Sequence, residues 1–185
     1  MSVFFTADTH LSHKAIIDHC HRPFASVEEM DATLIDNINS VVTRGDLLYI
    51  VGDFSLGNRA VVEANRKRIN CAQVFLIRGN HDSLSAKQYE ECGFIFKGDL
   101  CEVKVEGQKI SLCHYAMRRW PNSHHGAWHL HGHSHGHLGD TGQDFSFDVG
   151  VDCFKFAPIS FERVKEIMAE RSNALAWPNH DNLPI

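Results

Sequence analysis

The chain has 185 residues, of which 43% are hydrophobic and 22% are charged, as is usual for one globular domain. This composition excludes disordered and collagen-like chains, and no apolar run approaches the roughly 20 residues that a membrane-spanning helix requires. The formal net charge of −5 argues against a protein that holds nucleic acid by a broad basic surface. We therefore expect a single domain over residues 1–185.

Short apolar runs alternate with helix signals in the first half of the chain. Each predicted helix follows a Ser or Asn side chain that can accept a hydrogen bond from the first helical turn. This alternation predicts a parallel sheet built through right-handed crossovers. The predicted strands cover residues 3–7, 47–52 and 74–79, and the predicted helices begin after Ser26, Asn58 and Ser85.

The second half of the chain is richer in strands. Residues 94–114 predict short strands joined by a Gly-containing turn, with no room for a helix. Two further strands are expected at 127–130 and 145–149, and a last helix follows Ser160. Together the elements indicate one α/β domain with its sheets packed inside helices. The tail 176–185 contains two prolines and is expected to wrap the surface.

The apolar runs share one feature, which is that each leads to residues able to bind a metal. Ligands of open α/β sheets bind beyond the carboxyl ends of the strands, so these side chains are expected to meet in one crevice. They offer oxygen and nitrogen donors without sulfur, and they are too many for one four-coordinate ion. Two adjacent divalent metals fit the set better. Its members are Asp8, His10, Asp53, Asn80, His81, His114, His133 and His135.

Five short motifs contain these residues, and together they resemble the motifs of the calcineurin-like metallophosphoesterase superfamily. In chain order they are Asp8-Thr9-His10, Gly52-Asp53, Gly79-Asn80-His81-Asp82, His114 and Gly132-His133-Ser134-His135. The chain is similar to the small phosphoesterases of bacteria and their viruses. The resemblance implies an α/β fold in which a two-sheet β-sandwich is flanked by helices, in four αββα layers.

The resemblance also implies a role for each motif residue. Asp53 would bridge two metals, and His81 would bind neither metal and would face the leaving group as the catalytic acid. The remaining ligands would divide between the two ions. One ion would be held by Asp8, His10, Asp53 and His135, and the other by Asp53, Asn80, His114 and His133.

The chemistry expected of such a site is hydrolysis of a phosphate ester. Two divalent ions lower the pKa of a water between them, so a bridging hydroxide is available near neutral pH. His81 would give a proton to the leaving oxygen or stabilise its charge. Manganese is the expected metal, and Fe, Zn, Co and Ni are alternatives because an oxygen and nitrogen ligand set accepts them all.

Two positions depart from the Ser/Thr protein phosphatases of the superfamily, which carry an Asp and an Arg shortly after the Gly-Asp motif. These positions are Leu56 and Gly57 here, so a partner of the catalytic histidine and a phosphate clamp are missing. No inserted cap domain is evident, which predicts a shallow site. The expected substrates are nucleotide-like or other small phosphodiesters, including nucleic-acid ends. The alternative is a phosphomonoesterase.

Four further side chains are candidates for substrate binding. A basic and aromatic loop shortly after His114 could grip a phosphate or stack on a base, although an exposed loop with a half-buried Trp is an equal alternative. Arg78 could equally be a buried ion-pair partner. The four candidates are Arg78, Arg118, Arg119 and Trp120.

Several other polar residues near the motifs are expected to be structural. His129 and His131 share a strand face with His133 and are expected to support the ligands rather than bind a third metal. Asp82 is expected to hold its turn. A structural role is also favoured for residues that would otherwise form the opposite wall of the site, namely His13, His21 and Arg22.

Two other classes of function compete with the enzyme. Seven of the 14 histidines lie between positions 124 and 137, which suggests a metal-buffering protein, although His124, His125 and His137 are expected in loops. A non-catalytic scaffold is the second alternative, and it is disfavoured because every motif residue is present. The six cysteines form no Cys-x-x-Cys pair and predict buried free thiols of a reducing, cytoplasmic compartment. No signal peptide or membrane contact is expected, and the oligomeric state is left open.

Overall fold

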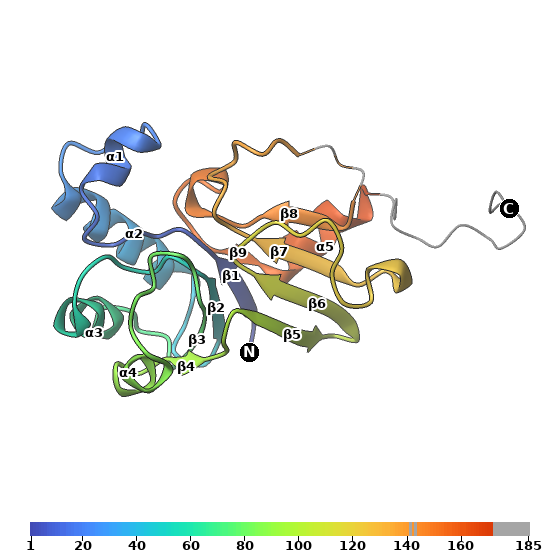
Figure 1. The fold of residues 1–185 in the computed structure, drawn as a ribbon, viewed down its shortest axis with the longest axis horizontal. Coiled ribbons are helices and arrows are strands. Elements are labelled where there is room, and N and C mark those ends of the chain that lie inside the picture. Colours follow the sequence, from blue (N-terminus) through green and yellow to red (C-terminus); the bar gives the residue numbers. More distant parts are fainter. Residues whose placement is uncertain (141, 143, 172–185) are drawn as a thin grey trace, which may run out of the picture.

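The computed structural model describes residues 1–140, 142 and 144–171, so the tail 176–185 lies outside the described part. Two β-sheets lie side by side, with helices on the outer side of the first (Figure 1). This arrangement confirms the predicted α/β fold of two sheets flanked by helices.

The first sheet has five strands in the order β4-β3-β2-β1-β9. The pairs β1–β2, β2–β3 and β3–β4 are parallel, as the alternation of strand and helix predicts, and β9 pairs antiparallel with β1 at the edge. The sequence did not indicate the two-residue strand β9, whereas β4 lies within residues 94–114, where short strands are predicted. The strands are β1 (Val3–Thr6), β2 (Leu47–Val51), β3 (Gln73–Ile77), β4 (Ile95–Phe96) and β9 (Ile159–Ser160).

The second sheet has four strands in the order β5-β6-β7-β8. The predicted hairpin pairs β5 with β6 antiparallel, and its turn residues Glu106 and Gly107 both have positive φ, as tight hairpin turns require. Strands β6, β7 and β8 are parallel to one another. Their bounds are β5 (Leu100–Val105), β6 (Gln108–Cys113), β7 (Trp128–His131) and β8 (Ser146–Asp148).

The four predicted helices are present, and each begins at the predicted cap. Ser26, Asn58, Ser85 and Ser160 each accept a hydrogen bond from a backbone N–H of the first turn. One short helix was not predicted, because its five residues are too few to show a helical period. The helices are α1 (Ala15–His19), α2 (Val27–Val41), α3 (Arg59–Lys67), α4 (Ala86–Glu91) and α5 (Phe161–Ala169).

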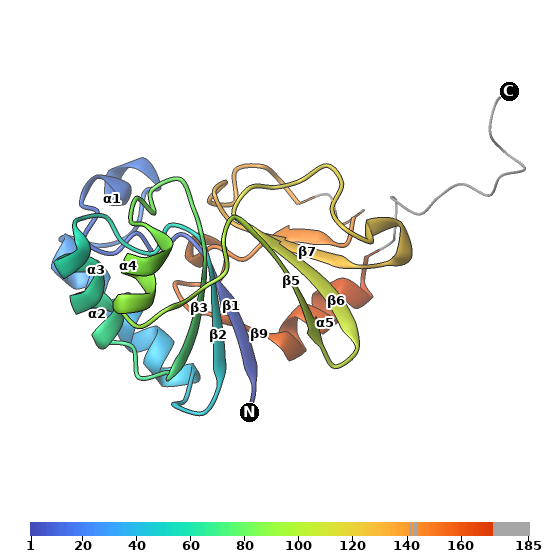
Figure 2. The ribbon, with the colours of Figure 1, turned by 60° about the horizontal axis from the view of Figure 1, so that its bottom comes forward.

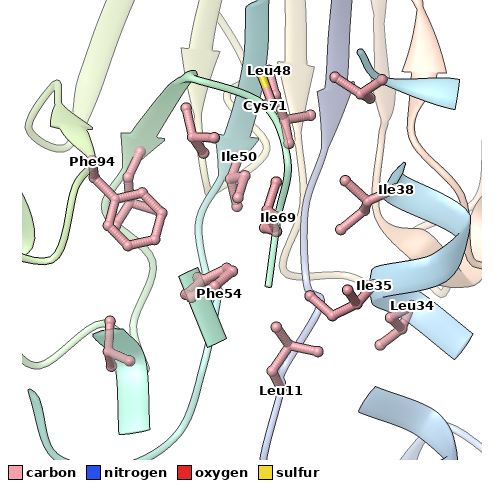
Figure 3. Close-up of a cluster of buried hydrophobic side chains, with 14 of the residues drawn as sticks. Leu11, Leu34, Ile35, Ile38, Leu48, Ile50, Phe54, Ile69, Cys71 and Phe94 are labelled. Carbon is pink, nitrogen blue, oxygen red and sulfur yellow. The ribbon is translucent and has the colours of Figure 1, made fainter. Parts of the chain in front are cut away.

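Two hydrophobic cores hold these layers together. The first lies between the outer face of the five-stranded sheet and its helices, and Figure 3 shows Ile38 of α2 directed toward the strand that carries Leu48 and Ile50. The second lies between the two sheets, where Leu112 and Leu130 face the first sheet. Helix α5 closes that second core through Phe161, Val164 and Met168, opposite the side on which α1–α4 lie (Figure 2).

The fold bears on two expectations from the sequence, namely that no helix spans a membrane and that the cysteine thiols are buried. No helix among the described residues is long and apolar enough to cross a bilayer.

The six cysteines are free thiols, but the expectation that they are buried holds for Cys71 and Cys92 and is wrong for Cys153, which is exposed. A cysteine in an apolar run is buried only if that run lies in a core, and Cys153 instead lies in a surface turn.

Candidate metal centre

The predicted ligands come from the carboxyl ends of strands in both sheets. Asp8 follows β1 and Asp53 follows β2, and the two strands are parallel neighbours. The second sheet contributes His114 after β6 and His133 after β7, which are also parallel neighbours. The backbone N–H of His133 donates to both carboxylate oxygens of Asp8, at 2.9 and 3.1 Å, and so joins the two sheets at this point.

Backbone strain is concentrated at these strand ends. Only glycine adopts positive φ without cost, and other residues held there cost on the order of 1–3 kcal/mol each. Local hydrogen bonds hold the strained residues, such as those from the N–H of Asp8 to Gly52 O and from the N–H of His10 to Asp53 O. Five predicted ligands have positive φ, namely Asp8 (57°), His10 (48°), Asp53 (55°), His133 (68°) and His135 (47°). Because the strained residues are the same ones that form the metal motifs, the strain indicates a functional site.

One group of donors surrounds the buried Asp8. The ligand atoms of Asp8, His10 and His135 all lie within 4.8 Å of one another. His10 Nε2 is 3.9 Å from Asp8 Oδ1 and 3.4 Å from Asp53 Oδ2. The rings of His10 and His135 stack with their centroids 5.2 Å apart. The four residues that the sequence assigns to one metal therefore gather at one place.

A second group of donors surrounds Asn80, whose amide oxygen lies 3.0 Å from His114 Nε2 and 2.9 Å from His133 Nδ1. His114 Nε2 is also 3.4 Å from Asp53 Oδ2. The same carboxylate oxygen is thus 3.4 Å from one histidine of each group. Asn80 and His133 are exposed while His114 is buried, so this side of the centre opens to solvent.

The residues fit divalent cations on three observations. Ligands at about 2.1 Å from an ion stand about 3.0–3.4 Å from one another, which matches the donor separations around Asn80 and Asp53. The buried atom His10 Nε2 has no hydrogen-bond partner among the described residues. Burial raises the pKa of Asp8 to about 7, as expected for a carboxylate removed from water without a full countercharge. A cation would compensate both residues.

His114 and Asp53 form the most polarised pair of the centre. Burial raises the pKa of Asp53, but the hydrogen bond and charge of His114 outweigh it and hold that pKa at about 2. Burial lowers the pKa of His114, and the same pairing raises it to about 9. His114 Nδ1 lies 2.9 Å from Val51 O, which directs Nε2 toward Asp53. Asp53 therefore carries its negative charge at neutral pH.

The glycines of the motifs leave room for the carboxylates. A Cβ on Gly79 would overlap Asp53 Oδ1, and a Cβ on Gly132 would stand 2.6 Å from Asp8 Oδ2. Contacts this short do not occur in folded proteins, so a side chain at either position must displace the ligand.

Gly79→Ala is expected to lower the affinity for Mn²⁺ by about 10- to 100-fold, because disturbing the orientation of a ligand has effects of that size. A titration of the metal-free protein with Mn²⁺ measures this. Gly45→Ala is the matched control, since a Cβ there meets nothing within 4 Å. Equal affinities of the two variants would contradict the steric argument.

His135 is oriented by a carboxylate that the sequence did not indicate. Asp152 Oδ2 lies 2.7 Å from His135 Nδ1, which leaves Nε2 of His135 as the nitrogen available to a metal. Burial lowers the pKa of His135, but the hydrogen bond to Asp152 outweighs it and raises that pKa. Asp152 lies in a short 3₁₀ turn at residues 151–153, far from any motif, so no sequence signal marks it.

Arg22 supports both Asp152 and Asp8, which confirms the structural role favoured for it. Its buried guanidinium donates from Nε and Nη2 to the two oxygens of Asp152, each at 2.8 Å. Nη2 also donates to Asp8 O at 2.7 Å, and Nη1 donates to Thr9 O at 3.1 Å. Arg22 thus links the first motif to Asp152, which in turn contacts His135 of the last motif.

Asp152→Asn is expected to weaken Mn²⁺ binding by about 10- to 100-fold, the usual effect of removing a carboxylate that orients a metal-binding histidine. The loss should arise at the donors around Asp8, because the side chain of Asp152 is bonded to His135 and to Arg22. Calorimetric titration of the metal-free protein with Mn²⁺ checks this. Asp18→Asn removes an exposed carboxylate from the same region and should bind as the wild type does. An unchanged isotherm for Asp152→Asn would refute the role.

His81 and Asp82 follow strand β3 and have different environments. The backbone N–H of His81 donates to Asp53 Oδ1 at 2.8 Å, while its half-buried ring lies 5.1 Å from that of His10. Asp82 is buried and accepts from the backbone N–H groups of Asp53 and Gly79, each at 2.8 Å. The structural role predicted for Asp82 is confirmed, since it holds the two loops that carry Asp53 and Asn80 together.

The four predicted substrate-binding side chains lie in different places. Arg78 donates to the backbone O of Asp82 at 3.2 Å and of Leu84 at 3.1 Å, which shows a structural use of its guanidinium. Arg118 and Trp120 line a cavity of about 630 Å³ beside β7 and β8, and Arg119 is exposed on the same loop. Trp120 itself is buried, and its Nε1 donates to Ala127 O at 2.8 Å. Their contact with substrate stays a prediction.

His129 and His131 are buried on the outer face of β7, with ring centroids 5.3 Å apart. His129 Nε2 accepts from the backbone N–H of Met117 at 3.2 Å, and its Nδ1 lies 3.0 Å from Ser111 O. His129 therefore supports the loop that follows His114, a predicted ligand. Among the described residues, the possible metal-binding groups include His135 from this stretch but neither His129 nor His131.

Comparison with known proteins gives both family and fold matches. A model described as calcineurin-like phosphoesterase matches residues 1–153. An uncharacterised protein of the archaeon Methanocaldococcus jannaschii is 31% identical over 172 residues, which is 90% of each chain. The gene 66 protein of Mycobacterium phage L5 is 36% identical over 90 residues, 44% of this chain and 40% of its own. A structure of a protein of unknown function from Aquifex aeolicus superposes with a TM-score of 0.69 at 21% identity, over 90% of this chain and 98% of that one.

Proposed function

This chain belongs to the calcineurin-like phosphoesterase family, and from that premise we propose that it hydrolyses phosphodiesters with two divalent metal ions. Asp53 would contact both ions. The observation that carries it is the position of Asp53 Oδ2, which stands 3.4 Å from His10 Nε2 on one side and 3.4 Å from His114 Nε2 on the other.

The donors divide as the motifs suggest. Such a pair of ions, when bound, lowers the pKa of a water and withdraws charge from the phosphoryl oxygens. The first ion would be held by Asp8, His10, Asp53 and His135, and the second by Asp53, Asn80, His114 and His133, whose donor atoms lie close together in these two groups. Manganese is the proposed metal, and Fe, Zn, Co and Ni suit the same donors.

The protein's own residues supply orientation and a proton. Asp53 stays charged at neutral pH because His114 holds its pKa at about 2 after burial has raised it. His114 is in turn aligned by Val51 O. His81 contributes its backbone N–H to Asp53 and leaves its imidazole for the oxygen of the leaving group. The exposed side of the centre, at Asn80 and His133, admits a substrate larger than a free phosphate.

The charges around the centre favour a phosphodiester over a phosphomonoester. A monoester dianion needs more positive charge than a diester monoanion, and it usually receives that charge from a free arginine. Arg22 and Arg78 are already bonded to Asp152 and to backbone carbonyls. Leu56 and Gly57 provide no replacement. A nucleotide or a nucleic-acid end would present a suitable diester.

The test compares bis(p-nitrophenyl) phosphate with p-nitrophenyl phosphate, using protein stripped of metal and reloaded with Mn²⁺. The proposal predicts a higher kcat/KM for the diester, loss of turnover on chelation, and about two Mn²⁺ per chain. A preference for the monoester would instead indicate a phosphomonoesterase. Two bound ions without turnover of either ester would favour the non-catalytic scaffold.

A further inference from the structure

His13 stands beside the centre, although the sequence favours a structural role for it. It lies three residues after His10 and is half-buried, while His10 is buried. The ring of His13 is 5.2 Å from that of His10 and 5.4 Å from that of His81, and the rings of His10 and His81 are 5.1 Å apart. The three imidazoles therefore form a compact triangle whose two half-buried members are His13 and His81.

One contact fixes the positions of the protons in this triangle. His13 Nδ1 lies 3.2 Å from His10 Nδ1, so one of the two nitrogens donates and the other accepts. His10 Nε2 is the atom that faces Asp53 Oδ2 at 3.4 Å and has no hydrogen-bond partner among the described residues. A nitrogen that binds a metal carries no proton, so the proton of His10 resides on Nδ1.

The tautomer of His13 follows from that of His10. If His10 Nδ1–H donates, His13 Nδ1 accepts, and a neutral His13 then carries its proton on Nε2. Within the part of the chain that the structure describes, only Nδ1 of this ring has a hydrogen-bond partner. The Nε2–H group is a donor without a protein acceptor, on a half-buried ring next to His81.

We propose that His13 is a second catalytic histidine, whose Nδ1 fixes the metal-binding tautomer of His10 and whose Nε2–H donates a hydrogen bond to the phosphate ester beside His81. This inference rests on the proposed phosphodiesterase function. The bond strengthens as negative charge develops on the phosphoryl or leaving oxygen, which is where a fixed donor lowers the barrier. No proton leaves His13, and His81 remains the proton donor.

Two amide substitutions separate the two nitrogens. Asparagine places its side-chain oxygen near the position of Nδ1 and has nothing at Nε2, whereas glutamine can place its amide near Nε2 and has nothing at Nδ1. His13→Asn is expected to keep the Mn²⁺ isotherm of the wild type and to lose about 10²-fold in kcat for bis(p-nitrophenyl) phosphate. His13→Gln is expected to bind Mn²⁺ about 10-fold more weakly and, at saturating Mn²⁺, to turn over faster than His13→Asn.

The controls distinguish this inference from the proposed function itself. His19→Asn alters an exposed histidine six residues away and should behave as the wild type in both assays. Wild-type kcat in His13→Asn would overturn the substrate contact, and a wild-type isotherm in His13→Gln would overturn the role of Nδ1. If the wild-type chain turns over neither ester, the proposed function and the substrate contact fail together, while the Mn²⁺ isotherms still decide the role of Nδ1.

Discussion

His81→Ala is expected to reduce kcat for bis(p-nitrophenyl) phosphate by about 10²- to 10⁴-fold while two Mn²⁺ ions remain bound. The physical reason is that His81 contributes to the two processes through different atoms. Its backbone N–H donates to Asp53 Oδ1 at 2.8 Å, and alanine keeps that bond. Only the imidazole is lost, and with it the proton for the leaving oxygen. Steady-state kinetics combined with metal analysis of the same sample measures both quantities.

The choice of leaving group sharpens this test. A proton donor matters most when the departing oxygen is strongly basic, so the defect should grow from p-nitrophenol to phenol and to an alcohol. His125→Ala removes an exposed histidine outside the metal-binding groups and should leave kcat unchanged. A defect of equal size for every leaving group would assign His81 to substrate positioning rather than to proton transfer.

Asp53→Asn is expected to have the largest effect on metal binding, lowering the Mn²⁺ content from two to fewer than one per chain and abolishing turnover. The carboxylate oxygen Oδ2 faces a histidine of each donor group at 3.4 Å. Asparagine preserves the shape of the side chain and its acceptor for the His81 N–H, but it removes the charge. Under the proposed function, two cations close together would then lose the anion that both contact. Elemental analysis after loading with excess Mn²⁺ checks the stoichiometry.

The fold should survive this substitution. Burial raises the pKa of Asp53 and His114 lowers it to about 2, so at neutral pH the charged carboxylate stabilises the metal-free fold, and asparagine loses that contribution. The far-UV circular dichroism spectrum should therefore be unchanged at 25 °C, while the melting temperature of the metal-free protein should fall. Asp36→Asn removes one exposed carboxylate and controls for net charge. Two tightly bound ions in Asp53→Asn would show that Asp53 does not bridge them.

Much of the fold could be predicted because its signals are local. Ser85 and Gln88 are three residues apart, and the structure shows both hydrogen bonds of the capping box that this spacing predicts. Strand β2 is an apolar run because helices cover one face and the second sheet covers the other. Helix α1 and strand β9 were missed, because five residues and two residues are too short for a hydrophobic period.

The same distinction applies to the candidate site. The donor types, their places at strand ends and the glycines beside them can be read from the motifs, because each motif is a continuous piece of chain. Residues that are far apart in the chain and meet only in the folded protein form no motif that the sequence could show. Asp152 and Arg22 are 130 positions apart, yet their side chains meet and act on His135 and Asp8. Arg78 illustrates the opposite case, since it was a candidate for substrate and the structure shows it bonded to the carbonyls of its own loop.

The sequence alone therefore determined which atoms can bind metal and on which ends of which strands they lie, because hydrophobic runs and motif spacing are properties of neighbouring residues. Only the tertiary structure decided which nitrogen of each histidine faces the centre. His10, His114 and His135 each have Nδ1 engaged, by His13, Val51 O and Asp152 respectively, and these partners come from three different parts of the chain. The orientation of an imidazole depends on the group that bonds its other nitrogen, and for His114 and His135 that group is brought there only by the fold, from 63 and 17 positions away.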